Sequence, residues 1–355
     1  MWITSLTLNN FRNYEEETFE FREGMNVLYG KNAQGKTNCA EAIYYLCTGT
    51  SPRARKDRQM IRTGADSASV SAEAQTKYGT LRLEADITGT GRQLRINGSR
   101  IARNADLLGN LRGIFFSPEE LRLVQGGPDE RRRFMNISLS QLSRSYYTAL
   151  VRYNKILAQR NALLKERDVS LVLETLPVWD VQLCRYAAEI AQRRREFVEE
   201  LAPVAAEKHA FLTDGKEALT VSFESRYRPE TLGDELAAGY ERDIRQGVTG
   251  TGPHRDDLKI CINGEDARSF GSQGQARTCA LSLKLAETEI FRRQAGEPPV
   301  LILDDVMSEL DLSRRRKLLA EVDGLQTVLT CTHTEKVLFG REVNKIRIVA
   351  GKIKR

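Results

Sequence analysis

The residues best suited by type and spacing to bind a ligand or to do chemistry form one uninterrupted run: Gly30, Lys31, Asn32, Ala33, Gln34, Gly35, Lys36 and Thr37. The run fits the pattern G-x-x-x-x-G-K-[ST] at every required position, with an apolar stretch before it and a helical pattern after it. Glycines let a backbone wrap phosphate groups closely, and the amides at a helix start point toward negative charge. Lys36 is expected to reach the β- and γ-phosphates, and the Thr37 hydroxyl to bind Mg²⁺. The sequence therefore predicts a nucleoside triphosphate site in preference to an accidental glycine-rich turn.

A second set of reactive side chains follows the apolar run Val300–Leu303, which ends in Asp304 and Asp305. Four apolar residues in succession are typical of a buried strand, and such a strand would deliver its acid to the carboxyl edge of a sheet. Asp304 is expected to hold Mg²⁺, and Asp305 to orient an attacking water. The alternative is that the two acids only end the strand and cap the next turn.

A third element is the run Ser272, Gln273, Gly274 and Gln275, which opens a predicted helix. A serine and the amides of a helix N-terminus offer donors and a positive dipole to a phosphate. An ordinary N-cap would explain the run equally well if it stood alone. Together with Ser308–Asp311, which follows the acidic pair, it resembles the signature motif and D-loop of ABC-type ATPases. In that class two heads close face to face, and each signature covers the γ-phosphate held by the other head.

Apolar periodicity predicts the elements that must position these residues. Strand-like patterns cover the first 29 residues and 68–96, with a hairpin turn at Asn97-Gly98, and a helix is expected over 38–48. Farther along, the patterns predict a second hairpin turn at Asn263-Gly264, helices over 273–294 and 312–322, and strands over 299–304 and 326–331. The last alternation is typical of a parallel sheet, so the fold class is α/β with a mixed sheet.

Residues 128–212 have a different character, with two apolar stripes at helical spacing. They predict a long antiparallel helical pair that is broken around Val169–Pro177. We therefore expect a discontinuous ATPase-type head, residues 1–116 and 252–355, with a mainly helical arm or lid, residues 117–251, inserted into it.

Charge and composition narrow the possible partners. The net charge is +6, and residues 131–200 hold 13 Lys and Arg against 8 Asp and Glu. Such a bias permits a polyanionic partner, although a solvated helical face would look the same. The basic residues put forward as DNA contacts are Arg53, Arg55, Lys56, Arg58, Arg131, Arg132 and Arg133. No run of 18 apolar residues argues for a membrane span, and six scattered cysteines suit reduced thiols in the cytoplasm.

Several motifs in order make the whole chain similar to the RecF family of bacterial recombination mediators, which are related to SMC heads. Besides the phosphate-binding loop, these motifs are Leu6–Tyr14, Ser117–Leu121, Gly127–Phe134, Gly252–Asp257, Gly271–Gln275 and Leu303–Asp311. The resemblance implies an ABC/SMC-head-like fold and an ATP-dependent DNA-binding protein. Such a protein forms a homodimer when ATP is bound and hydrolyses ATP slowly, with DNA stimulating the turnover.

The resemblance also implies partners and residue roles. Family members work with RecR and RecO to place RecA on gapped DNA, at junctions between single and double strands, and they serve replication restart and the SOS response. ATP contacts carry over to Gly30–Thr37 and Ser272–Gln275, Mg²⁺ contacts to Thr37 and Asp304, and catalytic roles to Lys36, Asp305 and His333. Asp305 stands where most ABC ATPases have glutamate, and its shorter side chain fits slow turnover.

Some readings stay open at this level. No glutamine stands within Ser117–Leu121, where ABC heads place one, and His333 is either a γ-phosphate switch or a polar loop residue. Arg255 is suited either to phosphate or DNA, or to an ion pair with Asp256 or Asp257. The competing functions are the ATPase subunit of an ABC transporter and a P-loop metabolite kinase. The basic helical pair argues against the first, and the lack of a recognisable acceptor pocket argues against the second.

Overall fold

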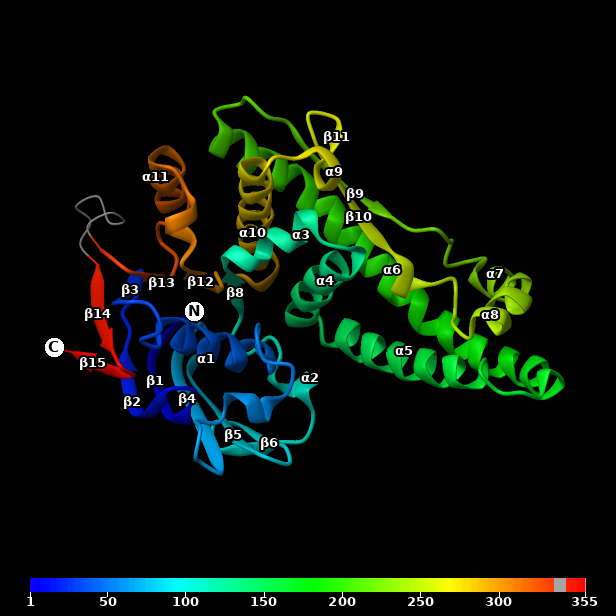
Figure 1. The fold of residues 1–355 in the computed structure, drawn as a ribbon, viewed down its shortest axis with the longest axis horizontal. Helices are drawn as coiled ribbons and strands as arrows, with labels where there is room; N and C mark the ends of the chain where they lie inside the picture. The colour runs from blue at the N-terminus through cyan, green and yellow to red at the C-terminus, as the bar shows by residue number, and fades with distance from the viewer. Residues whose placement is uncertain (335–342, 355) are drawn as a thin grey trace. The chain divides into compact units, whose positions relative to one another are not determined.

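The computed structural model describes residues 1–334 and 343–354 (Figure 1). These residues form two compact units, which we call the head and the arm. The head contains Met1–Leu121, Lys208–Lys216 and the residues from Arg277 onward, and the arm contains Arg122–Glu207 and Glu217–Ala276. The sequence places the domain boundaries after residue 116 and before residue 252. That these boundaries separate parts that fold independently stays a prediction.

The first sheet of the head is antiparallel throughout. Its strands are β1 (Trp2–Phe11), β2 (Tyr14–Glu20), β4 (Ser67–Thr76), β5 (Gly79–Thr88), β6 (Arg92–Ile96) and β7 (Ser99–Ile101). They lie in the order β2-β1-β4-β5-β6-β7. The predicted turn between β6 and β7 is confirmed, since Asn97 and Gly98 adopt φ values of 49° and 79°.

The second sheet positions the phosphate-binding loop and Asp304. Its strands are β3 (Met25–Tyr29), β8 (Gly113–Phe116), β12 (Val300–Asp304), β13 (Thr327–Cys331), β14 (Asn344–Val349) and β15 (Lys352–Lys354). The order is β15-β14-β3-β13-β12-β8, and only the β14–β15 pair is antiparallel. Because β3, β12 and β13 run parallel, their carboxyl ends share one edge of the sheet. The phosphate-binding loop follows β3 at this edge, and Asp304 is the last residue of β12 at the same edge.

Helices cover both faces of this second sheet. Helix α1 (Lys36–Thr48) contacts strands of both sheets and is buried from Cys39 to Thr48, so it forms the core between them. Helix α11 (Leu312–Glu321) and the head residues of α10 (Gln273–Ala295) lie on the opposite face (Figure 1). The remaining short helices of the head are α2 (Asn104–Leu107), η1 (Asp57–Met60), η2 (Pro118–Leu121) and η4 (Val306–Glu309). The expected α/β fold with a mixed sheet is confirmed.

The arm is mainly helical. Its helices are α3 (Arg122–Gln125), α4 (Pro128–Leu142), α5 (Arg144–Leu163), most of α6 (Val169–Thr213), α7 (Leu232–Ala238), α8 (Tyr240–Gln246), η3 (Pro253–Arg255) and α9 (Ala267–Phe270). A small antiparallel sheet joins β9 (Leu219–Glu224), β10 (Asp257–Ile262) and β11 (Glu265–Asp266). The predicted turn between β10 and β11 is also confirmed, with φ values of 54° at Asn263 and 86° at Gly264.

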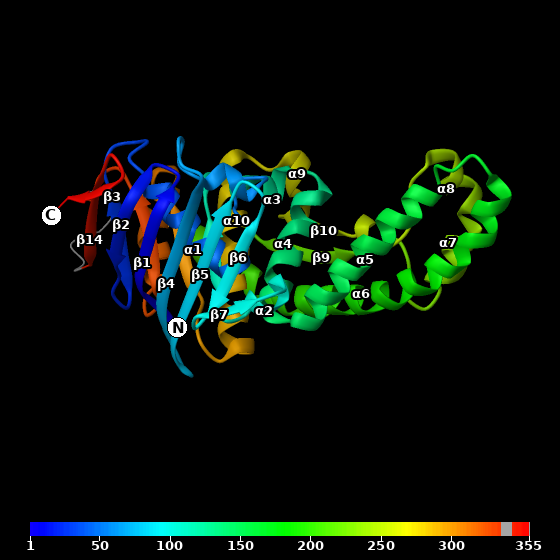
Figure 2. The same cartoon turned by 90° about the horizontal axis from the view of Figure 1, so that it is seen from below.

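The antiparallel helical pair is confirmed in α5 and α6, which lie side by side in Figures 1 and 2. Arg160, late in α5, binds Asp180 early in α6 at 2.6 Å, and Tyr146, early in α5, accepts a hydrogen bond from Arg194 farther along α6 at 3.2 Å.

The predicted break at Val169–Pro177 is wrong, because α6 continues through Pro177 and the chain turns before Val169. A proline inside a helix costs about 3 kcal/mol. Val172, Leu176 and Leu183 lie around Pro177 and are fully buried. Burial of each such side chain stabilises by about 1.5–3 kcal/mol, so together they outweigh the proline.

Among the described residues, no helix combines the length and the apolar character that crossing a bilayer requires.

Candidate nucleotide-binding site

Two glycines shape the loop between β3 and α1. Gly30 has φ of 151°, and a Cβ there would lie 2.3 Å from the backbone oxygen of Ile348. Gly35 has φ of 119°, and a Cβ there would lie 2.7 Å from the Tyr14 hydroxyl. Only glycine combines these backbone angles with such close neighbours, so both positions of the motif are required by geometry.

The loop is held from two sides through Gln34. Its backbone oxygen accepts hydrogen bonds from the Asn13 side chain and from the Gly351 amide, both at 3.0 Å. Its side-chain oxygen accepts one from the Ala350 amide at 2.6 Å. The turn between β1 and β2 and the turn between β14 and β15 thus fix the same residue, which preorganises the loop.

Lys36 points back across this loop. Its ammonium group donates to the backbone oxygens of Gly30 and Lys31, both at 2.8 Å. Burial lowers the pKa of Lys36, while the nearby carboxylates of Asp305 and Asp304 act in the opposite direction. A buried ammonium group enclosed by the loop is suited to an anion that lies in the same place.

Thr37 and Asp304 meet as the sequence predicts. The Thr37 hydroxyl donates to Oδ1 of Asp304 at 2.9 Å, and the Thr330 hydroxyl donates to the same oxygen at 2.8 Å. Burial raises the pKa of Asp304, and the hydrogen bonds from Thr330 and Thr37 partly oppose that rise. A hydroxyl and one carboxylate are hard oxygen donors, which fits Mg²⁺, an ion that usually takes one or two protein ligands beside phosphate oxygens.

Asp305 follows directly in the left-handed region, with φ of 54°. Its amide donates to the Thr330 hydroxyl at 2.9 Å, and its backbone oxygen accepts from the Ser308 hydroxyl at 2.8 Å. Both bonds anchor the backbone and leave the carboxylate half-exposed near the charge of Lys36. A carboxylate in this position can orient water, and its role as a base stays a prediction.

His333 lies two residues beyond the end of β13, at the same edge of the sheet as Asp304. It is exposed, and its Nδ1 is 3.1 Å from the Thr332 hydroxyl. The residues 335–342 that follow lie outside the described part of the chain. A switch role for His333 therefore stays a prediction.

Ser272 and Gln275 form a reciprocal capping box at the start of α10. The Ser272 amide donates to the Gln275 side chain at 3.0 Å, and the Gln275 amide donates to the Ser272 hydroxyl at 3.2 Å. The N-cap interpretation of Ser272 is thus observed. The phosphate contact expected for residues 272–275 stays a prediction, and Ser272 and Gln273 are exposed as such a contact requires.

Ion pairs on the side chains of α10 went unnoticed in the sequence. Within the head, Arg277 pairs with Glu309 of η4, in the segment that resembles the D-loop. Lys284 lies 3.6 Å from Glu120 of η2 and 3.2 Å from Glu287. Glu120 belongs to the segment Ser117–Leu121, where the sequence has no glutamine. The pairs Arg277–Glu309 and Lys284–Glu120 join residues far apart in sequence, so no local pattern could have revealed them.

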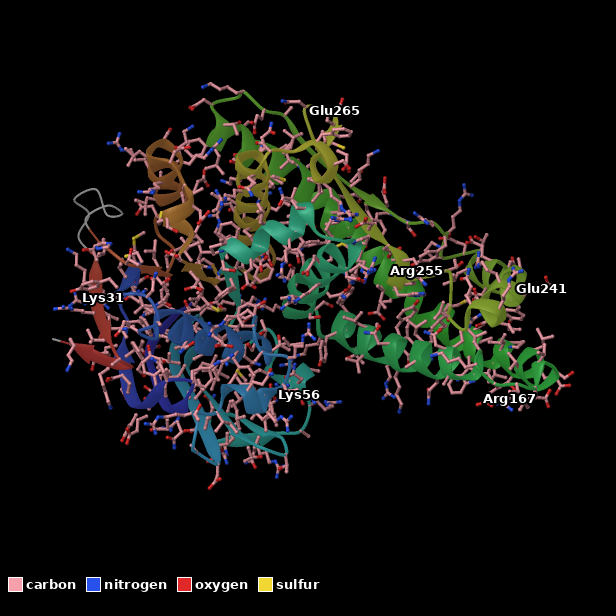
Figure 3. All side chains as sticks on the ribbon, in the orientation of Figure 1. Lys31, Lys56, Arg167, Glu241, Arg255 and Glu265 are labelled. Carbon is pink, nitrogen blue, oxygen red and sulfur yellow. The ribbon has the colours of Figure 1, made fainter. Side chains whose placement is uncertain are left out.

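The basic residues proposed as DNA contacts differ in their exposure and in their ion pairs. Arg55, Lys56 and Arg58 are exposed, and Lys56 is labelled in Figure 3. Arg53 instead donates to Glu41 and to the Asn38 side chain, next to the phosphate-binding loop.

In the arm, the three consecutive arginines that begin at Arg131 also differ. Arg131 is buried and binds both oxygens of Asp257 at 2.6 and 2.9 Å, so we remove it from the set of surface cations. Arg132 is half-buried and pairs with Asp129, and Arg133 is exposed.

A buried carboxylate, Glu41, organises the residues behind the loop. Arg12 donates to its two oxygens at 2.9 and 2.6 Å, and Arg53 and Ser51 donate to it as well. Burial raises the pKa of Glu41, but the hydrogen bond from Arg12 and the charge of Arg53 more than offset this, so the net shift is downward. The ionised form therefore stabilises the fold at neutral pH, and that contribution is lost as the pH falls through the lowered pKa.

Glu41→Gln is expected to lower the free energy of unfolding by about 3–5 kcal/mol at pH 7, because two arginines lose a buried anion. The difference from the unchanged protein should shrink below pH 4.5, the ordinary value for glutamate. Urea unfolding at neutral and acidic pH measures both effects. The exposed Glu23 provides a control as Glu23→Gln, and equal stability of the two variants at pH 7 would contradict the prediction.

Comparison with known proteins agrees with this geometry. Residues 2–354 match the family model described as the RecF/RecN/SMC N-terminal domain. The chain is 41% identical over 359 residues to the "DNA replication and repair protein RecF" of Lachnoclostridium phytofermentans, with 100% of each chain covered. It is also 41% identical to the protein of the same name from Symbiobacterium thermophilum, covering 95% of this chain and 93% of that one.

Solved structures give the same result. A structure titled "recombination mediator protein RecF-ATP in RecFOR pathway" matches with a TM-score of 0.91 at 31% identity, over 99% of this chain and 97% of that one. An SMC head domain from Pyrococcus furiosus matches with a TM-score of 0.57 at 16% identity, which shows a shared fold. The resemblance predicted from the motifs is confirmed: the chain belongs to the RecF family, within the wider group that shares the RecF/RecN/SMC N-terminal domain.

Proposed function

We propose that this protein binds ATP and Mg²⁺ in the head, dimerises when ATP is bound, and in that form binds DNA as a recombination mediator. The observation that carries the proposal is the meeting of Lys36, Thr37 and Asp304 at the carboxyl edge of parallel strands. This arrangement stands in a chain 31% identical to a RecF protein whose solved structure is described as bound to ATP. The reading as the ATPase of an ABC transporter is not favoured by these relatives.

The residues divide the chemistry among them. The loop amides and Lys36 would hold the phosphates, and Thr37 with Asp304 would hold Mg²⁺, which supplies positive charge that offsets the phosphates. Asp305 would orient the attacking water. Residues Ser272–Gln275 of a second copy would cover the γ-phosphate, so that ATP stabilises the dimer through contacts made only when two heads close.

Asp305→Asn is expected to leave ATP affinity unchanged and to slow hydrolysis about a hundredfold, because an amide cannot accept the proton of water. Asparagine tolerates the left-handed backbone of this position, so the fold should persist. Single-turnover phosphate release measures the rate, and a fluorescent ATP analogue measures binding. Normal hydrolysis by the variant would rule out Asp305 as the base.

Binding of DNA is expected to depend on phosphate contacts, because the exposed arginines and lysines offer charge and no base-stacking sheet is evident in the sequence. We propose duplex and gapped DNA, including junctions between single and double strands, as ligands. RecR and RecO would be direct partners and RecA an indirect one, since the RecF structures in the comparison are described as part of the RecFOR pathway.

The experiment that tests this function is a salt titration of DNA binding in the presence of ATP. We expect the logarithm of the association constant to fall linearly with the logarithm of salt concentration, with a slope of about −0.9 for each phosphate contacted. Fluorescence anisotropy of a labelled duplex, with and without ATP, measures it. A flat plot, or equal affinity without ATP, would remove the proposal.

A further inference from the structure

Two of the sequence motifs that the nucleotide site leaves unexplained, Gly127–Phe134 and Gly252–Asp257, meet at one hollow in the arm. The hollow has a volume of about 550 Å³ and lies wholly within that unit. Four arginines line it: Arg132 from α4, Arg226 after β9, Arg242 from α8 and Arg255 from η3. The acid among its lining residues is Asp129.

The four guanidinium groups are not equally engaged. Arg132 pairs with Asp129, and Arg242 lies 3.3 Å from Asp243. Arg226 and Arg255 are exposed, and among the described residues neither has a carboxylate within ion-pair distance. The hollow therefore carries more positive than negative charge, and such a patch attracts anions.

The segment that presents Arg255 is rigidly held. His254 faces the backbone oxygen of Thr249 with Nε2 at 2.9 Å and the Tyr153 hydroxyl with Nδ1 at 2.6 Å. Since a carbonyl can only accept, Nε2 carries the proton and Nδ1 accepts from Tyr153. Burial lowers the pKa of His254 to about 4, so this ring is neutral and adds no charge to the hollow.

The residues on either side of His254 and Arg255 are fixed as well. Gly252 has φ of 132°, and a Cβ there would lie 2.5 Å from the Tyr153 hydroxyl. Asp256 is fully buried and binds Arg194 at 2.8 Å, and Asp257 binds Arg131. Of the motif Gly252–Asp257, only Arg255 is thus exposed (Figure 3), and its backbone needs no further ordering to receive a ligand.

We propose that this hollow binds successive phosphates of a DNA backbone, an inference that rests on the proposed DNA-binding function. The planar guanidinium fork matches a phosphate with two parallel hydrogen bonds, which favours phosphate over a single-point anion. Among the residues that the structure describes, no aromatic side chain lines the hollow, so a base or a nucleoside would find no ring there to stack on. Contacts of this kind position a duplex without reading its sequence.

The test compares two double variants that remove the same charge from the arm. Arg226→Gln with Arg255→Gln changes the hollow. Arg152→Gln with Arg167→Gln changes exposed arginines of α5 and of the turn after it, and Figure 3 shows Arg167 far along the helical pair from Arg255. Anisotropy of a labelled duplex is measured across salt concentrations with ATP present. ATP binding and ATP-dependent dimerisation of each variant serve as the check on folding.

The hollow variant is expected to bind duplex at least about tenfold more weakly at low salt, with a salt slope shallower by about 1.8 for two lost phosphate contacts. The control variant should keep the slope of the unchanged protein. If the unchanged protein binds duplex and the hollow variant binds with the same slope, the inference fails while the proposed function stands. That outcome would instead leave the hollow to an acidic partner protein. If the unchanged protein binds no DNA, the proposed function fails first.

Discussion

Lys36→Ala is expected to weaken ATP binding about a thousandfold, or by about 4 kcal/mol, and so to abolish every ATP-dependent activity. The ammonium group is buried and lies among loop carbonyls, with both oxygens 2.8 Å away. Removal of the charge leaves bound phosphates without their closest cation in a site shielded from water, where charge interactions are strong.

The measurement for Lys36→Ala is equilibrium binding of a fluorescent ATP analogue. Lys345→Ala provides the matched control, because Lys345 is an exposed lysine of β14 in the same sheet. Thermal unfolding without nucleotide should be similar for both variants, which separates lost binding from lost folding. ATP affinity of Lys36→Ala within tenfold of the unchanged protein would contradict the assignment of this loop.

Ser272→Arg is expected to leave ATP binding intact and to prevent ATP-induced dimerisation. The side chain is exposed at the start of α10, and a long cation there would occupy the space that a phosphate of a second copy needs. The substitution also removes a helix cap, which costs about 1 kcal/mol. That loss is too small to unfold a chain of this size, yet it must be controlled.

Two further variants isolate the effect on the interface. Ser272→Ala removes the cap of α10 without adding bulk. Ser143→Ala removes the cap of α5, because the Ser143 hydroxyl accepts a hydrogen bond from the Tyr146 amide at 3.2 Å. Light scattering with and without ATP measures the mass of each protein. We expect Ser143→Ala to dimerise normally and Ser272→Arg to remain a monomer with ATP bound. A normal dimer from Ser272→Arg would disprove the composite site.

The candidate nucleotide site could be predicted from the sequence alone because its determinants are local. The loop Gly30–Thr37 needs glycines at fixed offsets, and the structure shows why, with 2.3 Å between a Cβ at Gly30 and Ile348. The position of Asp304 could be predicted in the same way, because a run of apolar residues that ends in an acid is typical of a buried strand with its carboxylate at the edge of the sheet. Hairpin turns at Asn97 and Asn263 followed from the need for positive φ.

What the sequence missed depends on contacts between distant residues. Arg131 looked like one of three equivalent surface cations, yet it pairs with Asp257, 126 positions away, and is buried. Arg53 forms an ion pair with Glu41 of α1, and the apolar pattern of that helix gave no sign of a buried acid. Pro177 looked like a break, because local propensity says nothing of the packing around Val172 and Leu176.

The clamp on Gln34 also bears on how the protein matures during translation. Residues 30–37 leave the ribosome early, but the amides of Ala350 and Gly351 that hold Gln34 emerge more than three hundred residues later. Strand β14, which pairs with β3 directly before the loop, is made equally late. A nascent chain therefore cannot complete the hydrogen bonds that fix Gln34 until residues 350 and 351 have been synthesised, long after the loop itself.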